Sequence, residues 1–155
     1  MKITLVTVDL RCPGWAAEAC EDYLSRFPRD WKVEAKAVRE EPRRGQPKEK
    51  LMAAEAERIR KALPKGAVLV TLDEHGRDLT TMQFARQLDA WQSEGSPVAF
   101  VIGGTDGIDP ALKKESRLMI RISSMTLPHA LAKVLLCEQL YRAWSVLNNH
   151  PYHRA

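Results

Sequence analysis

Three short runs of apolar and β-branched residues constrain the fold of this chain more than any other feature of its sequence. They occupy residues 3–8, 67–73 and 97–102. Such runs are typical of strands that are buried on both faces of a sheet. Between them, apolar residues recur at the three- to four-residue spacing of amphipathic helices. This alternation predicts an α/β fold with a mostly parallel sheet and helices on both faces.

The remaining elements complete a single expected domain over residues 1–155. The alternating stretch 31–38 indicates a strand with one solvent-facing side near a sheet edge, and 117–123 is expected to be the last strand. Thr80 and Asp109 have the side chains that cap helix N-termini. Helices are expected over residues 15–27, 48–63, 80–95 and 128–148, with a short one starting at Pro110.

In two of the predicted helices, the spacing of apolar residues predicts which face is buried. In the first, Trp15, Ala19, Tyr23 and Phe27 recur at every fourth position and predict a buried stripe. In the last, large apolar side chains cover about half of the circumference. Its polar side is formed by Glu138, Arg142 and Ser145. An apolar face this wide predicts a homodimer contact, and the alternative is that one large core uses all of it.

Charge and cysteine content narrow the class of protein. The net charge of +4 permits RNA binding but is small for a protein that holds nucleic acid by charge alone. Cys12, Cys20 and Cys137 are widely spaced, which argues against a metal site and favours a reducing compartment. No apolar run is long enough to span a bilayer, and the first residues do not form a signal peptide. We therefore expect a cytoplasmic protein with no membrane partner and no metal.

The segment 39–47 is the best candidate for a mobile loop, because it holds two prolines, a glycine and three arginines. One interpretation is a solvated connector. The other is a basic arm or lid that touches phosphate, in which Arg43 and Arg44, together with Arg11, would contact RNA.

Three segments that follow predicted strands carry small and polar residues. In a doubly wound sheet, ligands bind beyond the carboxyl ends of the strands. The first segment is Leu72 and Asp73, the second is the glycine turn 103–107, and the third is 123–128. The turn is neither a dinucleotide fingerprint nor a phosphate-binding loop. An adenosine-bearing cofactor without phosphates fits this edge better than a dinucleotide, although a plain strand-to-helix turn would also account for the glycines.

The C-terminal end is unusual because a long apolar helix is followed at once by histidine, tyrosine and arginine. His129 stands at the start of this helix, and His150, Tyr152, His153 and Arg154 follow it. These side chains donate hydrogen bonds, stack, or titrate near neutral pH. They predict a tail that contacts a substrate, with packing between subunits as the alternative.

Several motifs of the chain resemble those of the ribosomal RNA large-subunit methyltransferase H family. The matching segments are residues 126–129, 138–145 and 149–154, with shorter matches at 23–28, 70–73 and 102–104. The resemblance covers the whole chain, and its C-terminal block is long and irregular, hence specific. This family belongs to the SPOUT class of α/β-knot methyltransferases. The resemblance therefore implies a C-terminal trefoil knot, which periodicity alone does not predict because knots are rare.

The resemblance also implies an activity, a cofactor and partners. Members of the family are homodimers that use S-adenosyl-L-methionine to methylate N3 of a pseudouridine in large-subunit (23S) rRNA, and they act on the assembled ribosome. The turn reads Gly-Gly-Thr-Asp-Gly here, whereas the family often has Pro-Glu at its centre, so this chain keeps an acid in a looser turn. The implied cofactor-binding residues are Leu72, Gly103, Gly104, Ser123, Ser124, Met125, Thr126, Leu127 and Pro128.

Methylation of a base nitrogen requires alignment, loss of a proton and stabilisation of the charge left on the carbonyl oxygens. The catalytic candidates for these tasks are His153, His129, Arg142, Tyr152 and Arg154. His153 is the first candidate for the proton acceptor and His129 the second, while Tyr152 is expected to stack on the base. Two alternatives stay open: a non-catalytic, ribosome-associated RNA-binding protein on the same fold, and a nucleotide- or flavin-binding protein of flavodoxin type.

Overall fold

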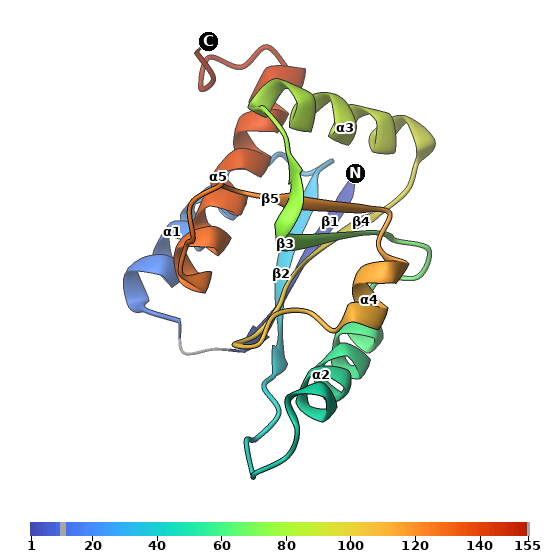
Figure 1. Cartoon of the computed structure of the whole chain (residues 1–155). Coiled ribbons are helices and arrows are strands. Elements are labelled where there is room, and N and C mark those ends of the chain that lie inside the picture. The colour runs from blue at the N-terminus through green and yellow to red at the C-terminus, as the bar shows by residue number, and fades with distance from the viewer. Residues whose placement is uncertain (10–11, 155) are drawn as a thin grey trace.

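The computed structural model describes residues 1–9 and 12–154, and it is built on a five-stranded sheet (Figure 1). The strand order is β2-β1-β4-β3-β5, and all four pairings are parallel. The strands are β1 (Lys2–Asp9), β2 (Lys32–Arg39), β3 (Val68–Asp78), β4 (Val98–Ile102) and β5 (Leu118–Arg121). The helices are α1 (Gly14–Ser25), α2 (Lys48–Ala62), α3 (Thr81–Glu94), α4 (Pro110–Glu115) and α5 (His129–Leu147). The predicted parallel α/β fold is confirmed.

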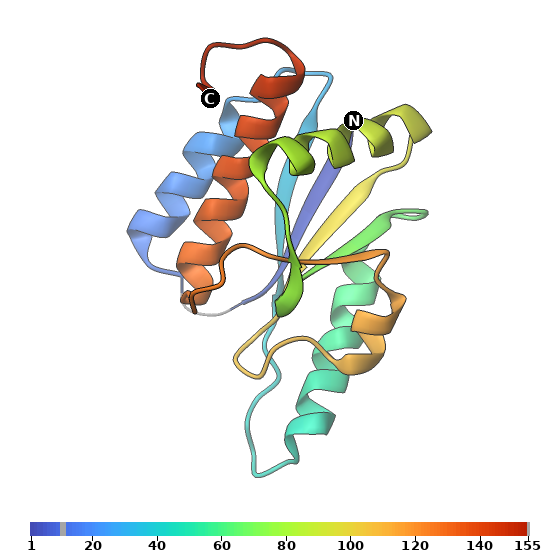
Figure 2. The ribbon, with the colours of Figure 1, turned by 45° about the horizontal axis from the view of Figure 1, so that its top comes forward.

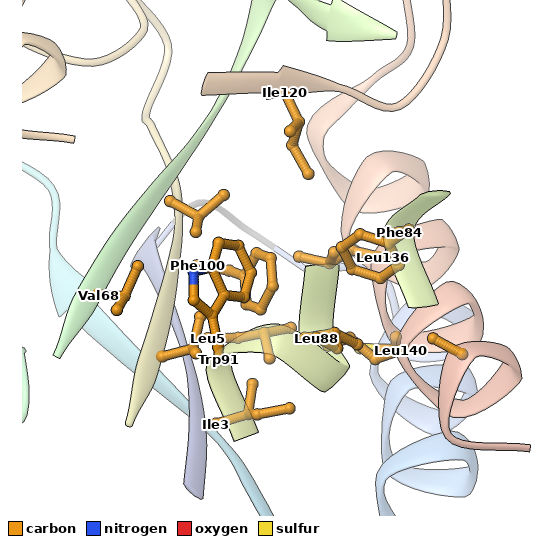
Figure 3. Packing of buried hydrophobic residues seen from close by; sticks show 14 of the residues in the cluster. Ile3, Leu5, Val68, Phe84, Leu88, Trp91, Phe100, Ile120, Leu136 and Leu140 are labelled. Carbon is orange, nitrogen blue, oxygen red and sulfur yellow. The ribbon is translucent and has the colours of Figure 1, made fainter. Parts of the chain in front are cut away.

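Helices cover both faces of the sheet, as the sequence predicted (Figure 2). On one face, α1, α3 and α5 enclose the larger apolar cluster, where Leu5 of β1, Leu88 of α3 and Leu140 of α5 are fully buried (Figure 3). On the other face, α2 and α4 cover a smaller cluster that includes Val101 and Leu112. Each fully buried side chain of this size contributes roughly 1.5–3 kcal/mol. The sheet is therefore held from both sides.

The burial of each strand follows its place in the sheet. All of β4, at the centre, is buried, whereas β2, at the edge, exposes most of its side chains. The alternating stretch was predicted to lie near an edge, and this is confirmed. No helix in the described part of the chain is long and apolar enough to cross a membrane.

Helix ends follow the capping expectations in one case and depart from them in another. Thr80 and Gln83 form a reciprocal capping box at the start of α3, with Gln83 N–H donating to Thr80 Oγ1 at 3.1 Å. Gly95 ends this helix in the left-handed conformation, at φ 72°. Asp109 stands at the N-cap of α4, with Pro110 in the first turn, but its side chain makes no capping hydrogen bond.

The buried faces of α1 and α5 differ from those predicted. The buried residues of α1 are Ala16 and Cys20, whereas Trp15, expected at the start of the buried stripe, is 55% exposed. In α5, Ser145 was assigned to the polar side but is fully buried, and its hydroxyl donates to the Arg142 carbonyl at 2.7 Å. Such a local bond lets a small hydroxyl enter an apolar interface without an unmet polar group.

β3 does not end in the polar turn that the sequence indicated at residues 73–76. The strand continues to Asp78, and its pairing with β5 shifts register within this segment. At this point the backbone of β3 passes very close to that of β5. Only glycine fits at position 76, because a Cβ there would lie 2.4 Å from the backbone carbonyl carbon of Ile120. Glycine within a strand often marks such a bulge.

Replacement of Gly76 tests the bulge. Gly76→Ala should lower the free energy of unfolding by about 1–3 kcal/mol, since a backbone atom of β5 must move to admit the methyl group. Urea unfolding followed by circular dichroism measures the loss. Gly14→Ala is the matched control, because nothing lies within 4 Å of its Cβ position. Equal stability of the two variants would contradict the close approach.

Candidate active site

A cavity of about 500 Å³ opens beside residues 72–75 of β3 and the segments where the chain leaves β4 and β5. All three segments that the sequence singled out contribute to its wall, and so does His129 at the start of α5. Of the predicted cofactor-binding residues, the lining set contains Leu72, Gly103, Ser123, Met125, Thr126 and Leu127. Gly104, Ser124 and Pro128 lie in the same segments but outside that set. The three separate segments thus form one concave site.

The glycine turn gives the cavity a wall made largely of backbone. A Cβ on Gly103 would lie 2.6 Å from the carbonyl carbon of Gly107, so no larger residue fits at this position. Gly107 N–H donates to the Gly104 carbonyl at 3.0 Å and has φ +88°, a conformation that L side chains rarely adopt. Nothing lies within 4 Å of the Cβ position of Gly107, so a ligand can approach the main chain closely at this residue.

Asp73 and Lys113 form an ion pair that lines the cavity and that the sequence did not reveal. Lys113 Nζ lies 2.6 Å from Asp73 Oδ2, and the Asp73 side chain is only 10% exposed. Burial alone would raise the pKa of Asp73, but the Lys113 ammonium and the His75 backbone N–H together hold it below its usual value. The sequence hinted at this site only through Asp73, which stands at the end of a predicted strand. Its partner Lys113 could not be foreseen, because it belongs to a different element, α4.

The segment between β5 and α5 forms the third wall. Ser123 Oγ accepts a hydrogen bond from Met125 N–H at 2.9 Å, which closes a local turn, and the Met125 side chain is 76% exposed. Pro128 occupies the N-cap position of α5 without a side-chain capping bond. His129 is the first residue of the helix, so it faces the cavity from a fixed element.

The other catalytic candidates gather around the opposite end of α5. Arg142 Nε donates to Glu138 Oε1 at 2.6 Å, and Arg142 Nη1 lies 3.3 Å from His153 Nδ1. The Tyr152 hydroxyl donates to the same Glu138 oxygen at 3.2 Å, and the Arg142 guanidinium lies 4.8 Å from the centre of the Tyr152 ring. We call Glu138, Arg142, Tyr152 and His153 the tail cluster. Arg154 follows it and is exposed.

The tail cluster provides hydrogen-bond donors. Burial and the neighbours Tyr23 and Glu138 raise the pKa of Tyr152, so it keeps its proton at neutral pH. Burial opposes the charge of Arg142, but Glu138 outweighs it and raises the pKa. Because a guanidinium only donates, His153 Nδ1 must accept from Arg142, and a neutral His153 then carries its proton on Nε2. That Nε2 is buried and has no hydrogen-bond partner among the described residues.

Within one chain, the tail cluster does not meet the cavity. Arg142 lies thirteen residues beyond His129 on α5, which corresponds to about 20 Å along the helix axis. Figure 1 shows the C-terminus beside the C-terminal end of α5, whereas the segment between β5 and α5 lies at the other end of the helix. His129 is therefore the only one of the five catalytic candidates that lines the cavity of its own chain.

Comparison with known proteins places the chain in a class. A family model described as "Predicted SPOUT methyltransferase" matches residues 1–153. A solved structure of a probable methylase family protein from Haemophilus influenzae matches 99% of this chain and 70% of its own, with 16% identity and a TM-score of 0.61, which supports the fold. The chain is thus a SPOUT-class methyltransferase, an enzyme of methyl transfer.

Closer relatives define the family. The chain is 53% identical over 156 residues to the ribosomal RNA large subunit methyltransferase H of Burkholderia ambifaria, with both chains fully covered. The protein of the same name from Burkholderia thailandensis matches equally well. The chain therefore belongs to the ribosomal RNA large subunit methyltransferase H family. The predicted resemblance is confirmed, and membership implies the trefoil knot of the SPOUT class.

S-adenosyl-L-methionine, the cofactor of this class, fits the cavity. A volume of about 500 Å³ lies within the usual range for ligands of this size. Gly107, with nothing within 4 Å of its Cβ position, leaves the main chain open to a flat ring, and Leu72 and Leu127 offer apolar surface. Asp73, Lys113 and Asp106 bring charge of both signs to the rim. The site thus has the mixed character that an adenosyl amino acid requires.

The Asp73–Lys113 pair leads to a pH-dependent prediction. Asp73→Asn should lower the free energy of unfolding by roughly 1–3 kcal/mol at pH 7, because a charge-assisted hydrogen bond is lost. The folded pKa of Asp73 lies below its ordinary value of 3.8. Its stabilisation is therefore present above that ordinary value and disappears as the pH falls through the folded pKa.

Urea unfolding at pH 7 and pH 3 measures this difference. The gap between the native protein and Asp73→Asn should narrow at pH 3, and a constant gap would contradict the prediction. Asp78→Asn is the control, since the Asp78–Arg121 pair is on the surface and such pairs contribute little.

Proposed function

We propose that the protein transfers a methyl group from S-adenosyl-L-methionine to N3 of a pseudouridine in large-subunit rRNA. One observation carries the proposal: the chain that forms this cavity at its strand ends is 53% identical, over its full length, to enzymes named ribosomal RNA large subunit methyltransferase H. The cavity gathers segments that the sequence had already singled out for the cofactor. A single domain would carry the whole reaction.

The chemistry asks three things of the chain. Bound S-adenosyl-L-methionine provides a methyl group activated by its sulfonium, so the protein mainly aligns the acceptor nitrogen with it. The N3 proton must leave, and His129 is the titratable candidate that lines the cavity. The base then carries negative charge on its carbonyl oxygens, which donors stabilise. Arg142, His153 and Arg154 can donate there, and protonated Tyr152 can stack on the base and donate as well.

The geometry favours the opposite order of the two histidines. His153 Nδ1 already accepts from Arg142, so the other ring nitrogen, Nε2, is a donor, and a substrate reaches it only once this buried atom is uncovered. We therefore assign proton acceptance to His129 and binding of a carbonyl oxygen to His153. This reverses the order that the sequence suggested.

A homodimer would complete the site, because Arg142 of the tail cluster lies about 20 Å along α5 from His129 in the cavity of its own chain. A second cavity, of about 350 Å³, adjoins the first and shares Arg121 and Ile122 with it. Leu79 and Leu135 line this groove, and Met125 is exposed nearby. We propose that a second copy packs over this region and brings its own tail to the methyl donor.

The small net charge of +4 suggests how the RNA is selected. Electrostatic attraction to phosphates alone would be weak, so affinity must come from shape and from residues of both subunits. Exposed Arg44 and Arg154 are candidates for phosphate contacts. This argument favours a folded target, the assembled ribosome, over naked rRNA. We propose that the protein acts on it in the cytoplasm.

The central experiment is mass spectrometry of 23S rRNA after incubation with the protein and S-adenosyl-L-methionine. Whole ribosomes, isolated large subunits and naked rRNA should be compared, all taken from cells that lack the activity. We expect one N3-methylated pseudouridine, formed most efficiently on whole ribosomes. Calorimetry with the cofactor tests the alternative of a non-catalytic ribosome-binding protein. If S-adenosyl-L-methionine does not bind at tens of micromolar, this alternative is favoured.

Removal of the tail donors tests their role. His153→Ala and Arg154→Ala should each reduce methyl transfer by about 100-fold, the usual scale for donors that stabilise developing charge, while cofactor affinity stays unchanged. Single-turnover methylation and calorimetry measure the two quantities. A fall in cofactor affinity would instead assign the tail to the fold.

A mixing experiment tests whether the tail acts across the dimer. Thr126→Trp should fill the cavity and abolish cofactor binding, since Thr126 lines it. If the tail of one copy serves the cavity of the other, mixing this variant with His153→Ala restores activity, because one site of each mixed dimer has both parts intact. Failure to restore activity, with mixed dimers present, would rule out sharing.

A further inference from the structure

Glu55 is a buried acid that the reaction described above does not use. It lies on α2 and is 7% exposed. No other charged residue in the described part of the chain is buried. A buried carboxylate is costly unless it is hydrogen-bonded or paired. The contacts of Glu55 should therefore show which part of the structure it stabilises.

The contacts of Glu55 join two loops. Its Oε2 accepts a hydrogen bond from the backbone N–H of Glu41 at 3.0 Å. A Cβ added to Gly104 would lie 3.1 Å from its Oε1, so this oxygen lies directly against the glycine turn. Arg58, one turn further along α2, pairs with the Glu41 side chain. Glu55 thus stands between the loop after β2 and the turn that lines the cavity.

The loop 39–47 is fastened to the same turn by two further contacts. Arg43 forms an ion pair with Asp106, and Thr105 Oγ1 donates to Glu40 Oε1 at 3.3 Å. Thr105 and Asp106 both line the cavity. The expected basic arm therefore has one of its arginines committed to the cofactor site. Arg11, the third arginine that the sequence suggested for RNA, lies outside the described residues.

We propose that Glu55 is a positioning residue for the methyl donor, which holds the loop 39–47 and the glycine turn together so that Gly104, Thr105 and Asp106 keep the shape of the cavity. The inference rests on the proposed function, since it takes the cavity as the methyl-donor site. Glu55 itself does not line the cavity. Its effect on the donor must therefore pass through the turn.

The electrostatic setting indicates which substitution preserves this role. Burial raises the pKa of Glu55, and the nearby Glu40 and Asp106 add to the rise, while the Glu41 N–H and Arg43 oppose it. Charge is thus disfavoured at this position, whereas an acceptor oxygen is required. Glutamine keeps the length and the acceptor oxygen but removes the charge, so it should replace Glu55 with little loss.

Three variants of α2 test the proposal, with cofactor affinity measured by calorimetry and KM values measured for S-adenosyl-L-methionine and for ribosomes. Glu55→Ala should weaken cofactor binding about tenfold, the scale of one lost hydrogen-bonded anchor, and should raise the KM for the donor only. Glu55→Gln should restore most of the affinity. Glu57→Ala, which removes an exposed glutamate paired with Arg60 on the same helix, should change neither.

The outcomes separate this inference from the proposed function. A folded Glu55→Ala protein that binds the donor as tightly as the native chain would overturn the inference. If Glu55→Ala does not fold, Arg43→Met, at a half-exposed side chain, serves instead, and native affinity in that variant would likewise overturn it. If the native protein itself binds no S-adenosyl-L-methionine, the proposed function fails.

Discussion

The parallel register of three neighbouring strands is the constraint on which the rest of the structure depends. Leu72 of β3 pairs with Ile102 of β4 and with Ile120 of β5, so all three strands reach the same level of the sheet. Burial of β4 among its neighbours fixes this register, because a slip would turn apolar side chains toward the wrong face. The loops that follow the strands are then brought together at one edge, and the cavity forms there.

The length of α5 separates His129, which lines the cavity, from the hydrogen-bond donors of the tail cluster. His129, at its first residue, faces the cavity, whereas Arg142 of the tail cluster lies about 20 Å away along the axis. The two groups stay apart within one chain because α5 is a single continuous helix that packs against α1 and α3, with Leu136 and Leu140 fully buried. In our proposal, a second copy of the chain joins them. A fixed distance within one subunit would then make activity depend on dimerisation.

Three paired acids lie around the cavity and its glycine turn. Asp73 lies in the cavity and is matched by Lys113, while Glu55 lies behind the turn and is matched by a backbone N–H. Asp106, within the turn, is matched by Arg43. Each of these contacts joins two different parts of the chain: β3 with α4, α2 with the loop 39–47, and the glycine turn with the same loop. The cavity is thus a product of the whole sheet edge.

The sequence by itself determined the alternation of strands and helices, the buried central strands and the three segments that line the cavity, because period and strand-end position are local signals. Only the tertiary structure decided the continuation of β3 past Gly76, the inward turn of Ala16 in place of Trp15, the burial of Ser145 and the ion pair of Asp73 with Lys113. Each of these depends on a contact between residues far apart in the chain. The same holds for the distance between His129 and the tail cluster, since residue types reveal the groups needed for a reaction, but only packing shows which of them meet.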